Sequence, residues 1–403
     1  MEKIPQAIYH IFVDRFSTGD EERDRILSER HTIKELEDYG QSFLGGNLKG
    51  IIKRFDYIKE LGVDAVWISP IYKTSAYHGY HVTDFFSIDE RFGTVEDLRE
   101  LIKIFHQNNI KIIFDFIPNH CSSQHPFFID SQNNFNSKYR DWFIYKKWPG
   151  KYLCFLDFSE LPKLNLYNNE CQHYILEAAK YWIKEFNIDG YRIDHAIGPP
   201  LFFWKKLREE VEEIKRDFIL IPEIWFSGIK WKHLETLYFL HRKNGKINFL
   251  LLAEIIFKND QAKQNIACRK LEPYFDAMLD FAASDFLRKN YQNKETVESF
   301  VKNRESLFGK NNYIFLDNHD MSRFIFLCQN KLKYYKKGLK LFFSLRKPIV
   351  IYYGDEIGLR QKDCSIHKSH QDKEFRRFMK WEINKKEEKI LNLVKRKIKI
   401  NKD

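Results

Sequence analysis

Acidic side chains follow four short apolar runs of the sequence, and basic side chains lie close to them. The acids are Asp115, Asp194, Glu223 and Asp320. The neighbouring bases are His120, Arg192 and His319. A carboxylate after a strand often caps the next helix, so each acid alone has that structural explanation. Four acids at one place would repel one another unless they serve acid/base or nucleophilic chemistry. Retaining glycoside hydrolysis is such a chemistry, since it needs a nucleophilic carboxylate and a protonated carboxyl about 5 Å apart.

The apolar runs before these acids alternate with amphipathic stretches, which is typical of βα units around a parallel sheet. Eight strands are predicted, at Ala7–Val13, Ala65–Ser69, Lys111–Phe116, Gly190–Ile193, Phe218–Pro222, Ala277–Phe281, Tyr313–Leu316 and Pro348–Tyr353. Helices are predicted at Leu48–Leu61, Val95–Asn108, Glu170–Phe186, Phe202–Arg216 and Leu332–Leu345. Eight units predict an α/β fold, a (β/α)8 TIM barrel, whose catalytic groups lie at the carboxyl ends of the strands.

A plain barrel needs about 250 residues, and the chain has 403. The surplus is assigned mainly to residues 121–166, which follow the third strand without a helical period and are predicted to form an inserted subdomain. Residues 1–120 and 167–403 would be the two parts of the barrel. A second excess, at about 230–272, has its own helical pattern in Leu234, Leu237 and Leu240.

Composition and charge narrow the function classes. The hydrophobic fraction of 43% and charged fraction of 31% are typical of a soluble globular chain, and no apolar run is long enough to span a membrane. The net charge of +11 raises the question of nucleic acid, but it comes from 330–347 and 385–403, whose apolar spacing indicates outer helices with solvated lysines. The N-terminus lacks a secretory apolar segment, and the six cysteines lack zinc-site spacing. We therefore expect a cytoplasmic protein that binds neither nucleic acid nor membrane.

Four motifs containing the acids resemble those of the α-amylase family, glycoside hydrolase family 13. They are Asp115–His120, Gly190–His195, the stretch around Glu223, and Phe315–Asp320. The resemblance extends from Ile8 to Glu356. It implies that Asp194 is the nucleophile, that Glu223 is the acid/base, and that Asp320 binds the 2- and 3-hydroxyls of the sugar.

The same resemblance implies roles for the residues around these acids. Arg192 would keep the nucleophile ionised and oriented, and His120 and His319 would bind sugar hydroxyls. Tyr80 would stack on the glucose ring whose bond is broken. Trp225, two residues after Glu223, would form an aromatic wall on the leaving-group side.

Leu161–Asn165 resembles the MPKLN motif of the neopullulanase and cyclomaltodextrinase branch. Because the sequence starts directly at the first strand, we expect the N-terminal carbohydrate-binding domain of that branch to be missing. The chain also ends too early for the family's C-terminal β-sandwich. We therefore expect no such sandwich, and the surface that it would cover is exposed, reshaped or used in a homo-oligomer.

Calcium is left open by the sequence, and no other cofactor is expected. The family's N-terminal calcium loop corresponds to residues that include Thr18, Asp20, Arg23, Asp24 and Asn47, and an arginine there opposes a cation that wants six or more oxygens. Asn119 matches a residue near the family's other calcium site.

The expected function is retaining hydrolysis of α-1,4 glucosidic bonds, with α-1,6 bonds left open, in maltooligosaccharides, cyclodextrins or starch-like glucans. An α-glucan transglycosylase would use the same carboxylates and pass the glycosyl group to a sugar hydroxyl. A non-catalytic carbohydrate-binding barrel is a third reading, against which stands the presence of Asp194, Glu223 and Asp320.

Overall fold

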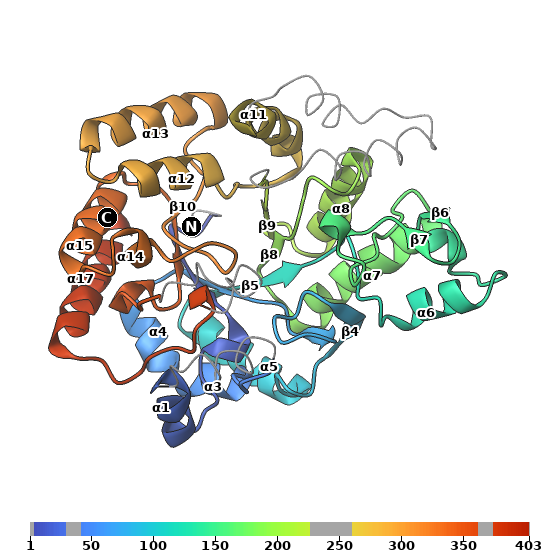
Figure 1. Cartoon of the computed structure of the whole chain (residues 1–403), viewed down its shortest axis with the longest axis horizontal. Helices are drawn as coiled ribbons and strands as arrows, with labels where there is room; N and C mark the ends of the chain where they lie inside the picture. Colours follow the sequence, from blue (N-terminus) through green and yellow to red (C-terminus); the bar gives the residue numbers. More distant parts are fainter. Residues whose placement is uncertain (1–3, 30–41, 226–259, 362–373, 403) are drawn as a thin grey trace.

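A curled parallel sheet of seven strands forms the centre of the computed structural model, which describes residues 4–29, 42–225, 260–361 and 374–402 (Figure 1). The order across the sheet is β10-β11-β1-β2-β5-β8-β9. The strands are β1 (Ala7–Ile11), β2 (Ala65–Ile68), β5 (Lys111–Phe116), β8 (Gly190–Ile193), β9 (Ile219–Pro222), β10 (Ile314–Phe315) and β11 (Ile349–Tyr352). Seven of the eight predicted strands are therefore present, with ends that differ from the predictions by at most two residues.

The eighth predicted strand, Ala277–Phe281, is wrong as a regular strand. Its contacts are one parallel bridge between Leu279 and Tyr313 and backbone hydrogen bonds to both edges of the sheet. The Asp276 amide donates to the Leu220 carbonyl oxygen of β9 at 3.0 Å, and the Tyr313 amide donates to the Met278 carbonyl oxygen at 2.8 Å. Residues 276–279 thus lie between β9 and β10, where an eighth strand would stand.

The end of that prediction fails because a helix begins there. Phe281 is the first residue of α12 (Phe281–Asn290), and the Asp280 side chain caps it by accepting from the Ala283 amide at 3.0 Å. An aspartate whose side chain accepts from the amide three residues later is a strong N-cap.

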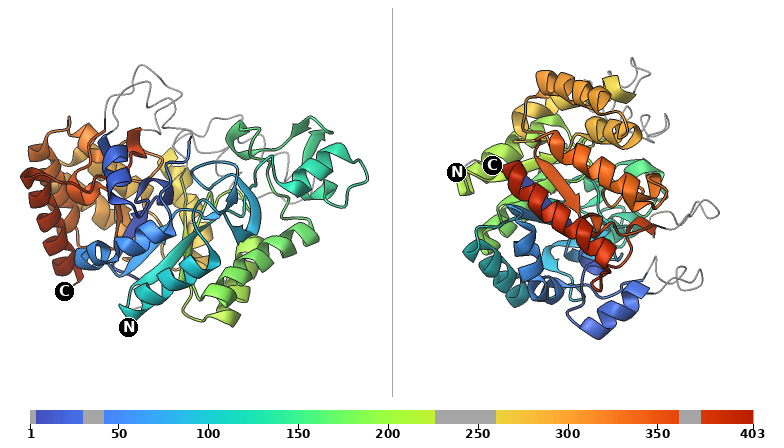
Figure 2. Two further views of the ribbon diagram at one scale, coloured as in Figure 1. Left: turned by 90° about the horizontal axis from the view of Figure 1, so that it is seen from below. Right: turned by 90° about the vertical axis from the view of Figure 1, so that its left-hand side faces the viewer.

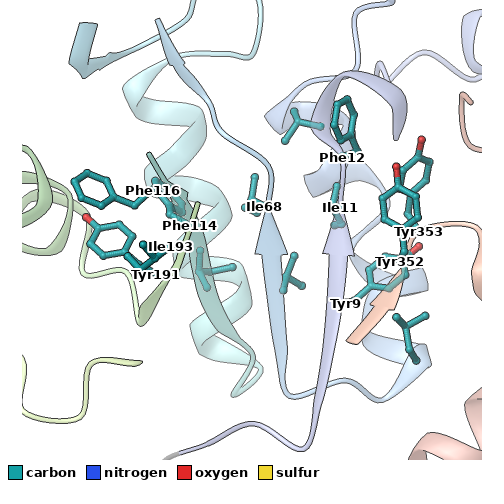
Figure 3. Close-up of a cluster of buried hydrophobic side chains, with 14 of the residues drawn as sticks. Tyr9, Ile11, Phe12, Ile68, Phe114, Phe116, Tyr191, Ile193, Tyr352 and Tyr353 are labelled. Atoms are coloured by element: carbon teal, nitrogen blue, oxygen red, sulfur yellow. The ribbon is translucent and has the colours of Figure 1, made fainter. Parts of the chain in front are cut away.

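The sheet separates two hydrophobic clusters, as the two-residue period of a strand requires. The inner cluster takes one set of alternate side chains, including Ile8, Trp67, Ile113 and Leu279. The outer cluster takes the other set and packs against the helices; Figure 3 shows part of it, with Tyr9, Ile11, Ile68 and Phe114 among its labelled members. Because Ala277 and Leu279 both belong to the inner cluster, the bridging segment packs inward as a strand of a closed barrel does.

Helices surround the sheet (Figure 1). They are α1 (Glu21–Glu29), α3 (Leu48–Lys53), α4 (Phe55–Leu61), α5 (Val95–Gln107), α7 (Asn169–Phe186), α8 (Leu201–Ile214), α11 (Asp260–Leu271), α12, α13 (Lys294–Phe308), α14 (Phe324–Leu327), α15 (Leu332–Ser344) and α17 (Lys385–Lys402). The predicted helix Leu48–Leu61 is two helices that meet at Arg54. Both basic segments are outer helices, as predicted, since Leu339 and Phe342 of α15 and Val394 and Ile398 of α17 are buried. Within the described ranges, no helix is long and apolar enough to cross a membrane.

Residues 121–166 form small elements at one end of the long axis of the molecule (Figure 2). They comprise α6 (Pro126–Asn133) and the antiparallel strands β6 (Tyr145–Lys147) and β7 (Lys151–Tyr152). Helix α6 was not predicted, although His125 caps it and Pro126 is its first residue, which are recognised helix-start signals. Of the second predicted excess, residues 230–259, including Leu234, Leu237 and Leu240, lie outside the described residues, and α11 occupies most of the remainder.

A second unpredicted feature is the antiparallel hairpin of β3 (Tyr72–Thr74) and β4 (Val82–Ile88). Its connecting residues include Tyr80, so this hairpin brings the predicted sugar-stacking ring to Asp115 of β5, to which the Tyr80 hydroxyl donates at 2.8 Å.

Candidate active site

Three of the four acids come from neighbouring strands. Asp115 lies in β5, Asp194 directly follows β8, and Glu223 directly follows β9. The carboxyl ends of these parallel strands meet at one edge, and all three residues are at most 7% exposed. The structure therefore brings the predicted nucleophile and the predicted acid/base together.

Arg192 joins the three carboxylates. Its Nη1 lies 2.7 Å from Asp115 Oδ1 and 3.0 Å from Asp194 Oδ1, and its Nη2 lies 2.5 Å from Glu223 Oε1. The side chain is only 1% exposed, because residues 190 and 192 lie on the inward-facing side of the curled sheet. The planar guanidinium holds several carboxylates in fixed directions, so its contact with Asp194 fits the predicted orienting role.

Burial shifts the pKa values of both predicted catalytic carboxyls in the same direction. Burial raises the pKa of Asp194 well above its usual range, and burial also raises the pKa of Glu223. Arg192 opposes both rises but is shared among three carboxylates. One cation cannot neutralise three buried anions, and a bound proton on the Asp194–Glu223 pair relieves the excess charge.

Asp115 has a place in the site to which the sequence assigned no role. Besides Arg192, it accepts hydrogen bonds from Trp67 Nε1 at 3.1 Å and from the Tyr80 hydroxyl at 2.8 Å, both through Oδ2. The Tyr80 ring in turn stacks on His319, with ring centroids 5.1 Å apart and an interplanar angle of 13°. Asp115 therefore positions Arg192 and Tyr80 at once.

Asp320 lies beyond β10 in a loop and is bound from two sides. His319 Nε2 is 2.9 Å from Asp320 Oδ2, and Arg376 Nη2 donates to Asp320 Oδ1 at 2.8 Å. Burial alone would raise the pKa of Asp320, but His319 and Arg376 more than offset it and hold the pKa well below its usual range. Asp320 is thus an anion, whereas the pKa values of Asp194 and Glu223 are raised.

Arg376 is a site residue that sequence reasoning missed. It also donates from Nε to the His319 carbonyl oxygen at 2.7 Å and from Nη1 to the Tyr77 hydroxyl at 3.1 Å. It lies 56 residues after Asp320 in a stretch with no strand or helix pattern, so no local signal in the sequence connects the two.

His120 and His319 each keep one buried ring nitrogen without a hydrogen-bond partner among the described residues, Nε2 of His120 and Nδ1 of His319. The His120 ring stacks on Phe155, with centroids 4.8 Å apart, and its Nδ1 contacts Asn119 Nδ2 at 3.2 Å. Burial lowers the pKa of His120 well below its usual range, so the ring is neutral. A neutral imidazole with an unpaired nitrogen is suited to a sugar hydroxyl.

Trp225 lies next to Glu223 but is partly occupied by protein contacts. Its ring stacks on Phe281, with centroids 5.2 Å apart and an interplanar angle of 12°, and it packs against the inner cluster. At most one face of the indole is therefore left for a ligand.

At the two places where the sequence left calcium open, several oxygens accept hydrogen bonds from protein donors. Asn119 Oδ1 accepts from the Lys163 amine, which also donates to the Gly198 carbonyl oxygen at 3.1 Å. In the loop after β1, Asp24 accepts from the Thr18 hydroxyl at 2.7 Å, and Arg23 Nη2 donates to the Leu44 carbonyl oxygen at 3.0 Å. Calcium takes six to eight oxygens, usually with carboxylates among them, so these hydrogen bonds compete with a cation for the same oxygens. No cluster of three or more metal-ligating side chains occurs in the part of the chain that the structure covers.

Comparisons with known proteins agree with this geometry. The family described as alpha amylase, catalytic domain, matches residues 10–392. The chain is 34% identical over 402 residues to alpha-amylase 2 of Dictyoglomus thermophilum, covering 98% of this chain and 62% of that protein. It is 33% identical over 406 residues to a cyclomaltodextrinase of Thermoanaerobacter pseudethanolicus, covering 98% and 63%.

Among solved structures, the alpha-amylase of Geobacillus thermoleovorans, complexed with acarbose, is 27% identical to this chain. It superposes with a TM-score of 0.74 over 99% of this chain and 79% of that one. The chain belongs to the α-amylase family of glycoside hydrolases. It spans about three fifths of the length of the curated relatives named above.

Proposed function

We propose that this protein is a retaining α-glucan hydrolase that cleaves α-1,4 glucosidic bonds in maltooligosaccharides, cyclodextrins or starch-like glucans. The observation that carries the proposal is the group of three buried carboxylates around Arg192. It provides two carboxyl groups with a shared proton beside a separate anion, Asp320. Relatives named as an alpha-amylase and a cyclomaltodextrinase support this substrate class.

In the first step, ionised Asp194 attacks the anomeric carbon while protonated Glu223 gives its proton to the leaving glycosidic oxygen. The carbon–oxygen bond to the leaving sugar breaks, and an ester bond to Asp194 forms. In the second step, Glu223 takes a proton from water, and the oxygen of that water attacks the same carbon and releases Asp194. The pair needs one bound proton in total, and the raised pKa values of both carboxyls favour binding it.

The remaining residues would bind the sugar at the bond that breaks. Asp320 would accept hydrogen bonds from the 2- and 3-hydroxyls, and His120 and His319 would use their unpaired ring nitrogens. Tyr80 would stack on the ring, and Trp225 would line the leaving-group side with its remaining face. Each contact accelerates the reaction to the extent that it strengthens in the transition state.

We also propose the finer domain organisation. In it, residues 1–120 and 167–403 form one eight-stranded barrel in which 276–279 take the eighth position, and residues 121–166 form an inserted subdomain. A location in the cytoplasm is supported by the five described cysteines, all of which are free thiols. The lack of a C-terminal β-sandwich and a homo-oligomeric state stay predictions.

Release of reducing sugar from maltoheptaose, β-cyclodextrin, pullulan and starch tests the proposal. Asp194→Asn and Glu223→Gln should each lower kcat by at least about a thousandfold while the thermal midpoint stays near that of the wild type. Asp141→Asn, an exposed position, is the control. A folded wild type that turns over none of the four substrates refutes the proposal. Longer oligomers formed early from maltotriose would instead identify a transglycosylase.

A further inference from the structure

Lys163 is a buried basic residue that the reaction above does not use. It lies in residues 121–166, where its backbone forms an antiparallel bridge with His120. The residue is 5% exposed, and its amine donates to Asn119 Oδ1 and to the Gly198 carbonyl oxygen. It therefore connects three separate parts of the chain: the 121–166 segment, the loop after β5 and the turn after β8.

The amine is held by neutral oxygens alone in the described structure, where no carboxylate pairs with it. Burial lowers the pKa of Lys163 to about 7, and the amine donates N–H in either protonation state. Burying such a group without a counter-charge lowers the stability of the fold. A structural or functional role of Lys163 would offset this cost.

The turn that Lys163 binds leads directly to the predicted acid/base. The Gly198 amide donates to the His195 carbonyl oxygen at 3.0 Å, and the His195 amide donates to Glu223 Oε2 at 3.1 Å. The turn is tightly packed, since a Cβ on Gly198 would lie 2.1 Å from Asn119 Oδ1. His195 itself has a φ of 43°, a conformation that needs support from its surroundings.

We propose that Lys163 is a positioning residue whose amine occupies a cation position between the 121–166 segment and the turn 195–198, and so holds the His195 amide on Glu223. The amine does with two hydrogen bonds what a bound calcium ion would do with six or more oxygens. The catalytic part of this inference rests on the proposed function, whereas the cation position does not.

The test uses Lys163→Met, which keeps the length of the apolar stem, and Lys147→Met as a control at an exposed position of the same segment. Lys163→Met should lower the thermal midpoint. It should also lower kcat on maltoheptaose by about tenfold or more with a change in KM below about threefold, since Glu223 loses its fixed partner. The Lys147 variant should match the wild type in both measurements.

Lys163→Asp tests the cation position without any activity measurement. It places a carboxylate beside Asn119 Oδ1 and the Gly198 carbonyl oxygen, so millimolar calcium should raise its thermal midpoint above the value in EDTA. The same additions to the wild type give the baseline, and a rise in the variant that does not exceed that baseline overturns the cation position.

An unchanged kcat in folded Lys163→Met overturns the positioning role. If the wild type itself hydrolyses no glucan, the proposed function fails, but the midpoints of Lys163→Asp still decide the cation position.

Discussion

Asp115 offers the sharpest test of how the site is held together, because one carboxylate serves three buried donors. In Asp115→Asn the shape is kept, but the charge is lost and one oxygen becomes an NH2 group. That group would face either Arg192 or the donors from Trp67 and Tyr80. At least one of these donors must then lose its acceptor.

The size of the effect follows from these contacts. Breaking one partner of a buried ion pair costs about 3–5 kcal/mol, and Arg192 keeps Asp194 and Glu223 as partners, so we expect the lower end, about 3 kcal/mol. With an unfolding entropy of about 2 cal/mol/K per residue, a chain of this length should lose about 3–4 °C in thermal midpoint. We also expect kcat/KM to fall by about tenfold or more, because Tyr80 and Arg192 both lose a fixed contact.

The pH profile gives a second readout with a definite sign. The charge of Asp115 is one of the causes that raise the pKa of Asp194. Removing that charge lowers the pKa, so the nucleophile stays ionised at lower pH and the acidic limb of kcat/KM moves to lower pH. Calorimetry and initial rates on maltoheptaose from pH 4 to 8 measure these effects, with Asp141→Asn as the control. A midpoint within about 1 °C of the wild type together with an unmoved acidic limb would refute the reasoning.

Three further predictions concern single contacts. Arg376→Gln removes a charged donor from Asp320 and should lower kcat/KM on maltoheptaose about 10- to 100-fold; an effect below twofold would contradict the assigned contact. Burial lowers the pKa of His125 to about 4. Between pH 6.5 and pH 4 this histidine therefore binds a proton in the unfolded chain but not in the folded chain, and the wild type loses stability as the pH falls. His125→Asn keeps an N-cap acceptor for α6 and should show about 2–3 kcal/mol less of this loss in urea titrations; an equal loss would rule out His125 as its source. Gly198→Ala places a Cβ 2.1 Å from the nearest side-chain oxygen and should cost about 1–3 kcal/mol in urea unfolding, whereas Gly150→Ala, where a Cβ meets nothing within 4 Å, should cost little.

The order of elements was predictable because the strands are short apolar runs that carry their own signal. The ends of β5, β8 and β9 were predicted to within one residue. The acids at these ends lie at one edge of the sheet because parallel strands share a direction. The hydrophobic period predicted the wrong element where a helix N-cap sets the local structure. Asp280 caps α12, so the end of a predicted strand is the start of a helix.

Contacts between distant segments were not predictable in the same way. Arg376 reaches Asp320 through the fold, and Lys163 reaches Gly198 from a segment that precedes α7. A side chain's partner across the fold leaves no mark on the local hydrophobic period. The number of carboxylates that share Arg192 was not predictable for the same reason, since it follows from contacts between strands.

The bridging segment 276–279 is held by fewer hydrogen bonds than the strands of the curled sheet. Six strand pairings join β10 to β9 the long way around, and the gap between those two edges is closed by a few hydrogen bonds. Glu223 directly follows β9 on one side of this gap, and Asp320 comes after β10 on the other side. Local opening there would widen the distance between the acid/base and the sugar-binding carboxylate without disturbing any regular pairing. Amide hydrogens of 276–279 should accordingly exchange with solvent faster than those of β1 and β2.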